Sequence, residues 1–362
     1  TRYADRSRGL GDVYKRQVLD RTDGSLISAE PYVAVSWASA IDPANGRPIE
    51  APNARYVDGP FLTMPSGLGG HNWHPMSYSP DTGLVYLPSQ DIPAPYLEDA
   101  GFEHADGFWN TGVDFRMLET PADPAMAAEV AKMVRGQLIA WDPVEQREAW
   151  RYQHLGPWNG GTLATAGGLV FQGSLVGEFA AYDAANGERL WVTDAQTGVA
   201  AAPATYAVDG EQYVTVAAGW GSIFALLGGE ALASMGLTNR SRILAYKRGG
   251  SAALPELAPA APQPMPEPPE QTASADTIAT GKSLYYQRCV ACHGVDVASG
   301  GITPDLRYSR AEVHDAWDAI VLEGALRGRG MPAFDSIFDG DDCLAVRSFV
   351  IDAAQKAYAR QQ

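Results

Sequence analysis

The sequence predicts a mainly β fold built from repeated hairpins, followed by a small all-α domain. Three observations support this division. The 362 residues exceed what one compact core of ordinary size holds. Glycine, tyrosine and tryptophan are abundant, with 38 Gly, 16 Tyr and 9 Trp, which favours short strands joined by tight turns. A proline-rich stretch at 251–275 separates residues 18–250 from residues 276–362, and we expect it to be an extended linker.

The first 17 residues fit neither part. Residues 1–17 are rich in Lys and Arg, contain no apolar core of a secretory signal and show no strand alternation. We interpret them as a doubtful or non-native extension. We also expect that a signal peptide of the parent protein, if it has one, is not present in this sequence.

A repeat dominates residues 18–250, with the pattern Ala-x-Asp-x-x-x-Gly-x-x-x-Trp. The complete copy begins at Ala181 and ends at Trp191, and a second copy runs from Ala140 to Trp150 with Gln146 in the glycine position. Weaker copies begin at Val18, Ala40 and Ser77. The pattern therefore has five candidate units.

Each copy predicts a hairpin. A strand ends at the Asp, the Gly supplies the positive φ that the turn needs, and a second strand leads to a Trp that can pack on the neighbouring unit. The starts at 140 and 181 are 41 residues apart, the length of a four-stranded propeller blade. We therefore predict a partial β-propeller; unrelated hairpins in a β-sandwich are the alternative.

The remaining elements follow from local patterns. Further strands are expected at 83–87, 168–172, 212–217 and 242–247. One helical insert is expected between Pro121 and Arg135. In the all-α domain, helical periodicity covers 276–288, 309–325 and 340–357.

The strongest chemical signal lies in the all-α domain, at the sequence CVACH of residues 289–293. Two thiols three residues apart, Cys289 and Cys292, can add to the vinyl groups of one haem, and the adjacent His293 then serves as an axial ligand to iron. A zinc site is the alternative, with His314 and Cys343 as the nearest further ligands, and a redox dithiol is another.

Met331 is the candidate for the second axial ligand. It lies 38 residues after His293 on a loop of Gly and Pro residues. Ligation by His and Met favours electron transfer because neither axial position is open to substrate. The domain thus resembles a class I cytochrome c, with Tyr285 and Phe349 expected to pack across two helices. Cys343 is expected to be a buried structural thiol.

The charge and hydropathy argue against nucleic-acid binding and against a transmembrane segment. A net charge of −16 argues against nucleic acid. No apolar run approaches the length of a transmembrane segment.

His71 and His74 are three residues apart, but the Gly and Pro residues around them predict a loop, so a metal pair there is the weaker interpretation.

Several segments of the β part resemble one family. They are VLDRTDG (18–24), ASAIDPANGRPIEAPNARY (38–56), GGHNWHPMSYSPDTGLVYLPSQ (69–90), GPWNGGTLATAGGLVFQG (156–173) and DGEQYVTVAAGWG (209–221). They are similar to the C-terminal half of a pyrroloquinoline quinone (PQQ) dependent alcohol dehydrogenase. With a cytochrome c domain behind a proline-rich linker, the chain resembles the type II quinohaemoprotein alcohol dehydrogenases over nearly everything from residue 18 on.

The resemblance implies an eight-bladed propeller with PQQ in its central channel. It also implies a calcium ion that polarises the quinone, an Asp as general base, and electron transfer from PQQ to haem c. The residues that it places around PQQ are Asn72, Trp73, Trp158, Gly219 and Trp220. Indole and amide groups between glycines suit a flat, acidic cofactor.

The resemblance also shows departures. The catalytic Asp, the calcium ligands and a vicinal cysteine pair of the family belong to blades that precede residue 18. A PQQ-contacting Lys has no counterpart, because Lys15 lies too close to residue 18. We therefore expect a truncated C-terminal portion of the enzyme, inactive by itself.

For the intact enzyme, the resemblance implies oxidation of an alcohol to an aldehyde or ketone in the periplasm. The external electron acceptor is expected to be a copper protein, a cytochrome or a quinone. Two alternatives stay open: an electron-transfer cytochrome with an inert propeller as docking module, and a PQQ-dependent dehydrogenase of sugars or polyols.

Overall fold

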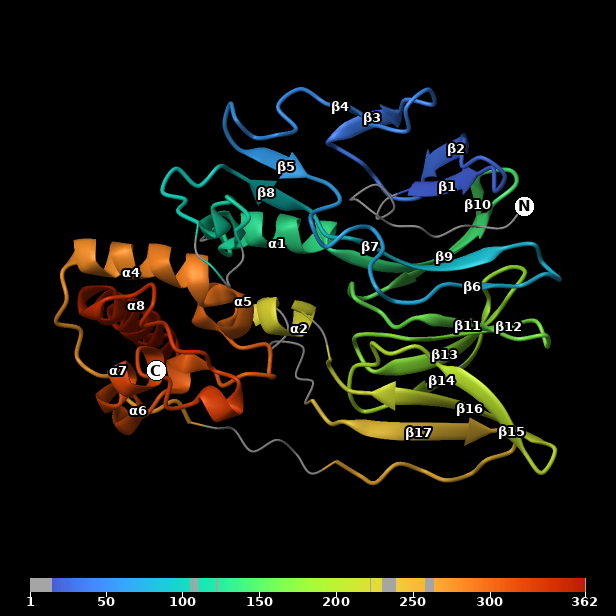
Figure 1. Ribbon diagram of the computed structural model, residues 1–362. Coiled ribbons are helices and arrows are strands. Elements are labelled where there is room, and N and C mark those ends of the chain that lie inside the picture. The colour runs from blue at the N-terminus through green and yellow to red at the C-terminus, as the bar shows by residue number, and fades with distance from the viewer. Residues whose placement is uncertain are drawn as a thin grey trace. The chain divides into compact units, whose positions relative to one another are not determined.

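The computed structural model describes residues 15–104, 106, 110–121, 123–221, 223–229, 239–257 and 264–361. The chain divides into two compact units, of which the first contains most of the sheets and the second most of the helices (Figure 1). The first unit, here the propeller unit, comprises residues 1–97, 121–221 and 237–257. The second, the cytochrome unit, comprises residues 98–120, 222–236 and 258–362. Two stretches from the hairpin region, 98–120 and 222–236, thus belong with the helices.

Two four-stranded antiparallel sheets form the centre of the propeller unit. The first has the order β10-β9-β7-β6, with bounds β6 (Ser77–Tyr78), β7 (Val85–Asp91), β9 (Arg135–Asp142) and β10 (Arg147–His154). The second has the order β11-β12-β13-β14, with bounds β11 (Thr162–Ala164), β12 (Leu169–Gly173), β13 (Glu178–Asp183) and β14 (Arg189–Asp194). In the second sheet, strands that follow one another in the chain pair as neighbours. In the first sheet β7 pairs with β9, although residues 94–96, which lie between them in the chain, form a strand of another sheet. Four antiparallel strands of this kind form a propeller blade.

Smaller sheets complete this unit. One has three strands, β15 (Ala204–Val208), β16 (Glu211–Ala218) and β17 (Arg242–Lys247). Three pairs are β1 (Lys15–Leu19) with β2 (Leu26–Pro31), β3 (Ala38–Ile41) with β4 (Pro48–Glu50), and β5 (Phe61–Thr63) with β8 (Ala94–Tyr96). Residues 15–17 of the expected extension are paired in β1, although the sequence shows no strand alternation there. The remainder, residues 1–14, lies outside the described part.

The five repeat copies are five hairpins, as predicted. The residue in the glycine position has a positive φ in every copy: Gly24 (78°), Gly46 (70°), Gly83 (72°), Gln146 (54°) and Gly187 (77°). The count of five units was wrong, however. The copies that begin at Ser77 and Ala140 are two hairpins of one sheet, β10-β9-β7-β6. Hairpin geometry is local, whereas membership of a sheet depends on distant pairing.

Trp150, at the end of one repeat, packs on the turn of the next sheet. Its indole Nε1 donates to the carbonyl of Ala184 at 3.1 Å. The ring lies so close to Gly187 that a Cβ there would come within 2.5 Å of it. The hydroxyl of Tyr86 donates to the same carbonyl at 2.8 Å. The predicted docking of a Trp between neighbouring units is confirmed here.

The helical insert of the propeller unit is α1 (Pro124–Met133). The carboxylate of Asp123 caps it by accepting from the backbone N–H of Ala125. A second helix before residue 250, α2 (Ile223–Leu227), was not predicted from the sequence. Its five residues are too few for a recognisable period.

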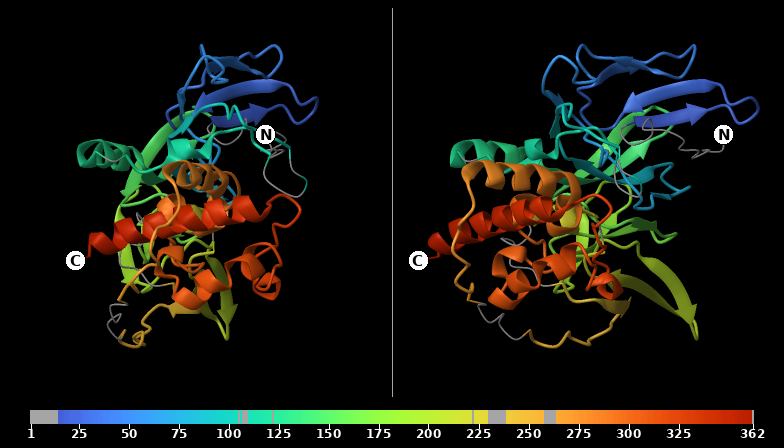
Figure 2. Two further views of the ribbon diagram at one scale, coloured as in Figure 1. Left: turned by 90° about the vertical axis from the view of Figure 1, so that its left-hand side faces the viewer. Right: turned by 60° about the vertical axis from the view of Figure 1, so that its left-hand side comes forward.

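The cytochrome unit is built around two long helices, α4 (Ala275–Arg288) and α8 (Gly340–Ala359), which pack against each other (Figure 2). Gly281 allows the close approach, because a Cβ there would lie 1.8 Å from the carbonyl oxygen of Ala345. The rings of Tyr285 and Phe349 are 5.4 Å apart, as expected. The predicted helix at 309–325 is two short helices, α6 (Ala311–Asp315) and α7 (Trp317–Val321).

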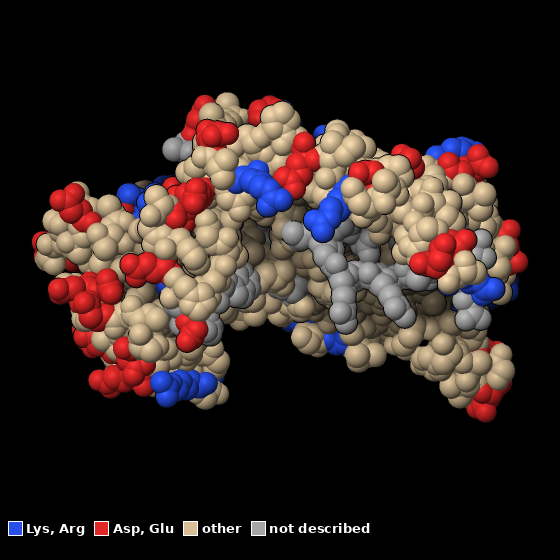
Figure 3. Space-filling model, turned by 45° about the horizontal axis from the view of Figure 1, so that its top comes forward, with Lys and Arg blue, Asp and Glu red and all other residues tan. Residues whose placement is uncertain are grey.

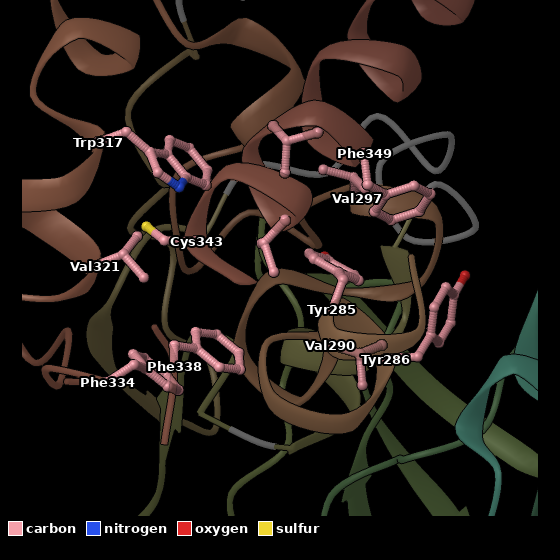
Figure 4. Close-up of a cluster of buried hydrophobic side chains, with 12 residues drawn as sticks. Tyr285, Tyr286, Val290, Val297, Trp317, Val321, Phe334, Phe338, Cys343 and Phe349 are labelled. Carbon is pink, nitrogen blue, oxygen red and sulfur yellow. The ribbon is translucent and has the colours of Figure 1, made fainter. Parts of the chain in front are cut away.

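The core of this unit buries aromatic rings from α4, α7 and α8 (Figure 4). Cys343 lies fully buried among them, and its Sγ donates to Asp318 at 3.3 Å. Burial and this bond raise the pKa of the Cys343 thiol to about 12. This placement of Cys343 agrees with the expectation that it is a buried structural thiol.

The stretch at 251–275, expected to be an extended linker, is partly packed on the cytochrome unit. Met265 is buried, the side chain of Gln271 donates to the carbonyl of Ser348, and the carbonyl of Pro269 accepts from Gln355. Residues 258–263 of this segment lie outside the described part. In the part of the chain described, no helix combines the length and apolar character needed to cross a bilayer.

Candidate functional site

The CVACH motif consists of Cys289, at the junction after α4, and the short helix α5 (Val290–His293); residues 289–293 are called the thiol turn. Cys289 ends α4, and its carbonyl accepts from the N–H of His293 at 2.9 Å. Cys289 packs against the aromatic core, whereas Cys292 is exposed. Burial raises the pKa of the Cys289 thiol to about 12. The motif thus presents two thiols and an imidazole from a single helical turn, which fits covalent haem.

His293 is held as a neutral imidazole. Desolvation by burial lowers its pKa, and the Pro304 carbonyl only partly opposes that shift. The neutral form is the one that ligates iron. Nδ1 is buried and makes no regular hydrogen bond within the described residues.

Met331 lies on the loop that follows the 3₁₀ turn η4 (Arg327–Arg329). Gly330 ends this turn in the left-handed conformation, with φ 92°. The Met331 side chain packs against the same buried cluster as Cys289. The fold therefore brings the predicted second axial ligand and the thiol turn to one core.

In the propeller unit, the predicted PQQ residues lie on loops next to edge strands of neighbouring sheets. Segment 69–76 precedes β6 and segment 156–161 precedes β11. These loops pack tightly: a Cβ on Gly161 would lie 2.6 Å from Pro75, and one on Gly160 would lie 2.6 Å from the carbonyl of Ala201. The Ser77 and Thr162 hydroxyls are 2.8 Å apart across β6 and β11. The structure thus brings these distant segments together.

Three aromatic rings contact one another in sequence in these loops. The rings of Trp73 and His74 are stacked at 4.1 Å, and His74 meets the edge of Trp158 at 5.2 Å. Trp158 is 1% exposed, whereas Trp73 is 53% exposed. Trp73 is therefore half exposed and stacks on buried His74, which in turn contacts buried Trp158.

His74 was considered only as part of a metal pair, and the structure gives it a different place. Burial lowers its pKa to about 4, with His71 adding to the shift. Its Nε2 has no hydrogen-bond partner among the described residues. His71 instead bonds through Nδ1 to the carbonyl of Pro88 at 2.9 Å.

Asn72 and Gln90 fix the loop geometry. Asn72 Nδ2 donates to the carbonyl of Leu68, and its Oδ1 accepts from the N–H of Trp73. Buried Gln90 donates to the carbonyls of Leu68 and Gly69 and accepts from the N–H of Trp158. Gln90 was missed from the sequence because its role depends on residues 68 positions further along the chain.

Gly219 and Trp220 follow β16. Gly219 has φ 142°, pairs with Val199 and donates to the carbonyl of Gly198 at 2.7 Å. Trp220 is buried, and its ring lies so close to Gly198 that a Cβ there would be 2.3 Å from its Nε1. This Nε1 has no hydrogen-bond partner within the described ranges. A buried donor without a protein acceptor suits an acceptor atom of a cofactor.

A metal site made only of protein ligands requires several such side chains close together. Among the described residues, no three or more His, Cys, Asp or Glu side chains are grouped so that they could hold a metal ion. The zinc alternative therefore lacks its ligand set there: His314 stacks on Trp317, and Cys343 bonds to Asp318. The face in Figure 3 carries many acidic side chains, in line with the net charge of −16.

Comparison with known proteins gives two family matches. Residues 132–214 match the model described as glucose/ethanol/alcohol dehydrogenase, beta-propeller domain. Residues 276–350 match the model of cytochrome C oxidase, cbb3-type, subunit III. The two matches fall in the propeller and cytochrome units respectively.

Curated relatives extend the similarity. Quinohemoprotein alcohol dehydrogenase ADH IIB of Pseudomonas putida is 44% identical over 94% of this chain and 48% of its own length. The 1-butanol dehydrogenase (cytochrome c) of Thauera butanivorans is 40% identical over 93% of this chain and 48% of its own length. The chain thus spans about half the length of these relatives.

Solved structures of quinohemoprotein alcohol dehydrogenases are similar to this chain over nearly its whole length. The quinohemoprotein alcohol dehydrogenase ADHIIG from Pseudomonas putida has a TM-score of 0.85 at 38% identity, covering 97% of this chain and 51% of that one. The enzyme of the same name from Comamonas testosteroni has a TM-score of 0.76 at 37% identity, covering 95% of this chain and 50% of that one. By sequence and by fold, the chain belongs to the family of quinohaemoprotein alcohol dehydrogenases.

Proposed function

We propose that this chain is part of an enzyme that oxidises alcohols to aldehydes or ketones with PQQ and haem c. The observation that carries the proposal is the CVACH motif: Cys289 and Met331 pack against one core, and partial burial lowers the pKa of the neighbouring His293. The other unit of the chain matches a PQQ-type propeller. The names of the relatives support alcohols as substrates, and one of them is a 1-butanol dehydrogenase.

Specific residues would hold the cofactors. Thioether bonds from Cys289 and Cys292, with His293 and Met331 as axial ligands, would hold haem c. Trp73, Trp158, Gly219 and Trp220 would line the PQQ cavity, and Asn72 would position Trp73 through its backbone N–H. When bound, PQQ supplies a two-electron acceptor and haem c a one-electron acceptor. Calcium completes the cofactor set, and we assign it no ligand among the described residues.

The partners and location are also part of the proposal. Electrons would leave haem c for an external copper protein, cytochrome or quinone, with no nucleic acid as partner. The periplasm is the proposed compartment because haem c is attached outside the cytosol. We further propose that the part of residues 18–250 that belongs to the propeller unit acts as propeller blades, that residues 251–275 connect the two parts, and that residues 276–362 act as the cytochrome domain.

The test has two stages. The chain is first produced in a host that attaches haem c, and covalent haem is assayed by its absorption after denaturation. Enzyme containing this sequence is then loaded with PQQ and calcium and given ethanol, 1-butanol or glucose, while the reduced haem band is recorded. Reduction by the alcohols supports the proposal. Reduction by glucose alone would favour a sugar dehydrogenase, and reduction by neither would favour an electron-transfer protein with an inert propeller.

A further inference from the structure

The turn that follows the predicted axial ligand is strained. At residues 294–298, Gly294 has φ 81°, and the next positive values belong to Asp296 (57°) and Val297 (60°). A β-branched residue such as Val rarely adopts this left-handed conformation. Strain of this kind persists only where surrounding contacts over-determine the backbone.

Inside the cytochrome unit, α4 holds this turn. The hydroxyl of Tyr286 donates to Asp296 Oδ1 at 3.1 Å and accepts from the N–H of Asp296 at 3.2 Å. The hydroxyl of Tyr285 donates to the carbonyl of Gly294 at 2.8 Å. Val297 is fully buried. Three hydrogen bonds and one buried side chain thus fix the turn from the core side.

Segment 110–120 holds the same turn from a second side. The N–H of Thr120 donates to Asp296 Oδ2 at 3.3 Å, so the two carboxylate oxygens of Asp296 serve two different partners. Next to it, Glu119 pairs with Lys282 of α4 at 2.5 Å. Phe115 packs against the aromatic core. The chain continues from Thr120 into the propeller unit at Pro121.

Segment 223–229 holds the turn from a third side. Gly229 is buried, and a Cβ there would lie 2.9 Å from the carbonyl oxygen of Val295. A Cβ on Gly294 would lie 3.3 Å from the carbonyl oxygen of Leu226 in α2. Only two residues separate Trp220, assigned to the PQQ cavity, from the start of α2.

We propose that the turn at 294–298 is a shared anchor for segments 110–120 and 223–229, with Asp296 and Gly229 as its positioning residues. The anchor joins the residue after the haem ligand to two stretches of chain that continue into the propeller unit. It therefore connects the CVACH motif at 289–293 to the loop that carries Trp220. The inference rests on the proposed function in taking His293 as the haem ligand and Trp220 as part of the PQQ cavity.

A shared anchor predicts coupling between two segments that are more than 100 residues apart in the sequence. We expect Gly229→Val, which forces a side chain against Val295, to loosen the turn and thereby segment 110–120. Amide hydrogen exchange of the haem-loaded full chain, followed by mass spectrometry, should then show roughly tenfold faster exchange at 110–120. Glu119→Gln should in turn speed exchange at 223–229.

The matched control is Gly249→Val, because Gly249 also has a positive φ, 72°, but no atom within 4 Å of its Cβ position. Gly249→Val should leave the amide exchange rates of both 110–120 and 223–229 unchanged. The reduced haem spectrum, recorded with dithionite, verifies that each variant is folded, and Gly229→Ala replaces Gly229→Val if the latter does not fold. Exchange that rises only at 223–229 in the Gly229 variant would overturn the shared anchor, whatever the outcome with alcohols.

Discussion

His293 and Met331 show how much of the proposed redox chemistry depends on single side chains. Burial keeps His293 neutral, so a lone pair is available at neutral pH without competition from a proton. Met331 supplies a thioether from a Gly-rich loop that packs on the same core. A thioether ligand raises the potential of a haem relative to an open or water-bound site.

Met331→Ala should therefore leave the haem covalently bound but lower its midpoint potential. We expect a decrease on the order of 100 mV or more, within the roughly 0.8 V range that axial ligands span. A redox titration followed at the reduced haem band measures it. Met126→Ala is the control, because Met126 is exposed on α1 of the other unit. An unchanged potential would assign the sixth position to another residue.

His74 should make folding sensitive to acid. Above pH 6.5 its ring is neutral in the folded and unfolded chains, so it contributes no pH dependence. As the pH falls from 6.5 toward the folded pKa of about 4, the unfolded chain takes up a proton that the folded chain does not. The free energy of unfolding should then fall by about 3 kcal/mol at most.

His74→Phe keeps a stacked ring and removes this titration. The loss of melting temperature between pH 7.5 and pH 5 should be smaller in this variant than in the wild type. His104→Phe, at an exposed position, should keep the wild-type loss. Equal losses in all three proteins would show that His74 does not titrate as described. Buried His154 and His314, whose pKa values are also lowered, keep the remaining acid sensitivity.

At the scale of elements, the repeated hairpins act through their turns. The turn residue with positive φ lets the strands pair, and in one sheet it also makes room for the Trp of its neighbour. Gly187 combines both roles, because it has φ 77° and faces the ring of Trp150. The contact between these neighbouring sheets thus depends on the absence of a side chain at Gly187, which leaves room for the Trp150 ring.

Gly187→Ala should destabilise the propeller unit more than Gly210→Ala. Both glycines have a positive φ, but Gly210 has no atom within 4 Å of its Cβ position. The backbone penalty, about 1 kcal/mol, is common to both. Crowding against Trp150 should add about 1–3 kcal/mol in the Gly187 variant. Urea unfolding measures the difference, and equal losses would rule out this packing contact as a source of stability.

Local chemistry explains which elements could be predicted from the sequence. The five turns, the long helices and the thiol turn depend on residues close together in the chain, such as Gly187 or Cys289 with His293. The sheet that joins the Ser77 and Ala140 hairpins and the role of Gln90 depend on distant partners, so no local pattern marks them. The same holds for α2, because its contacts with α5 involve residues far along the chain.

At the scale of the whole molecule, the two units have separate cores. The sheets bury aliphatic and aromatic residues in three clusters, whereas the helices share one aromatic cluster next to the thiol turn. The residues proposed to hold haem, Cys289, Cys292, His293 and Met331, all belong to the second unit, where bound haem would add apolar contact area. Its removal should therefore affect one unit selectively.

The double variant Cys289→Ser, Cys292→Ser should abolish covalent haem and separate the two thermal transitions. We expect the midpoint temperature of the helical transition, followed by circular dichroism at 222 nm, to fall by roughly 10 °C or more, because a bound ligand stabilises the fold that holds it. Intrinsic fluorescence of the Trp residues in the sheets should change little in midpoint. The control Cys343→Ala should keep the haem. Equal shifts in both signals would mean that the units unfold together.

The membership of segments 98–120 and 223–229 in the cytochrome unit determines where the chain can be divided. A gene fragment cut at the proline-rich segment would encode the haem-binding helices but leave behind Phe115, Thr120 and α2, which cover the haem-binding turn. The carboxy-terminal domain is therefore not an interchangeable cassette. A chimaera that joins parts of two distant homologues at the proline-rich segment should therefore combine mismatched residues at these contacts.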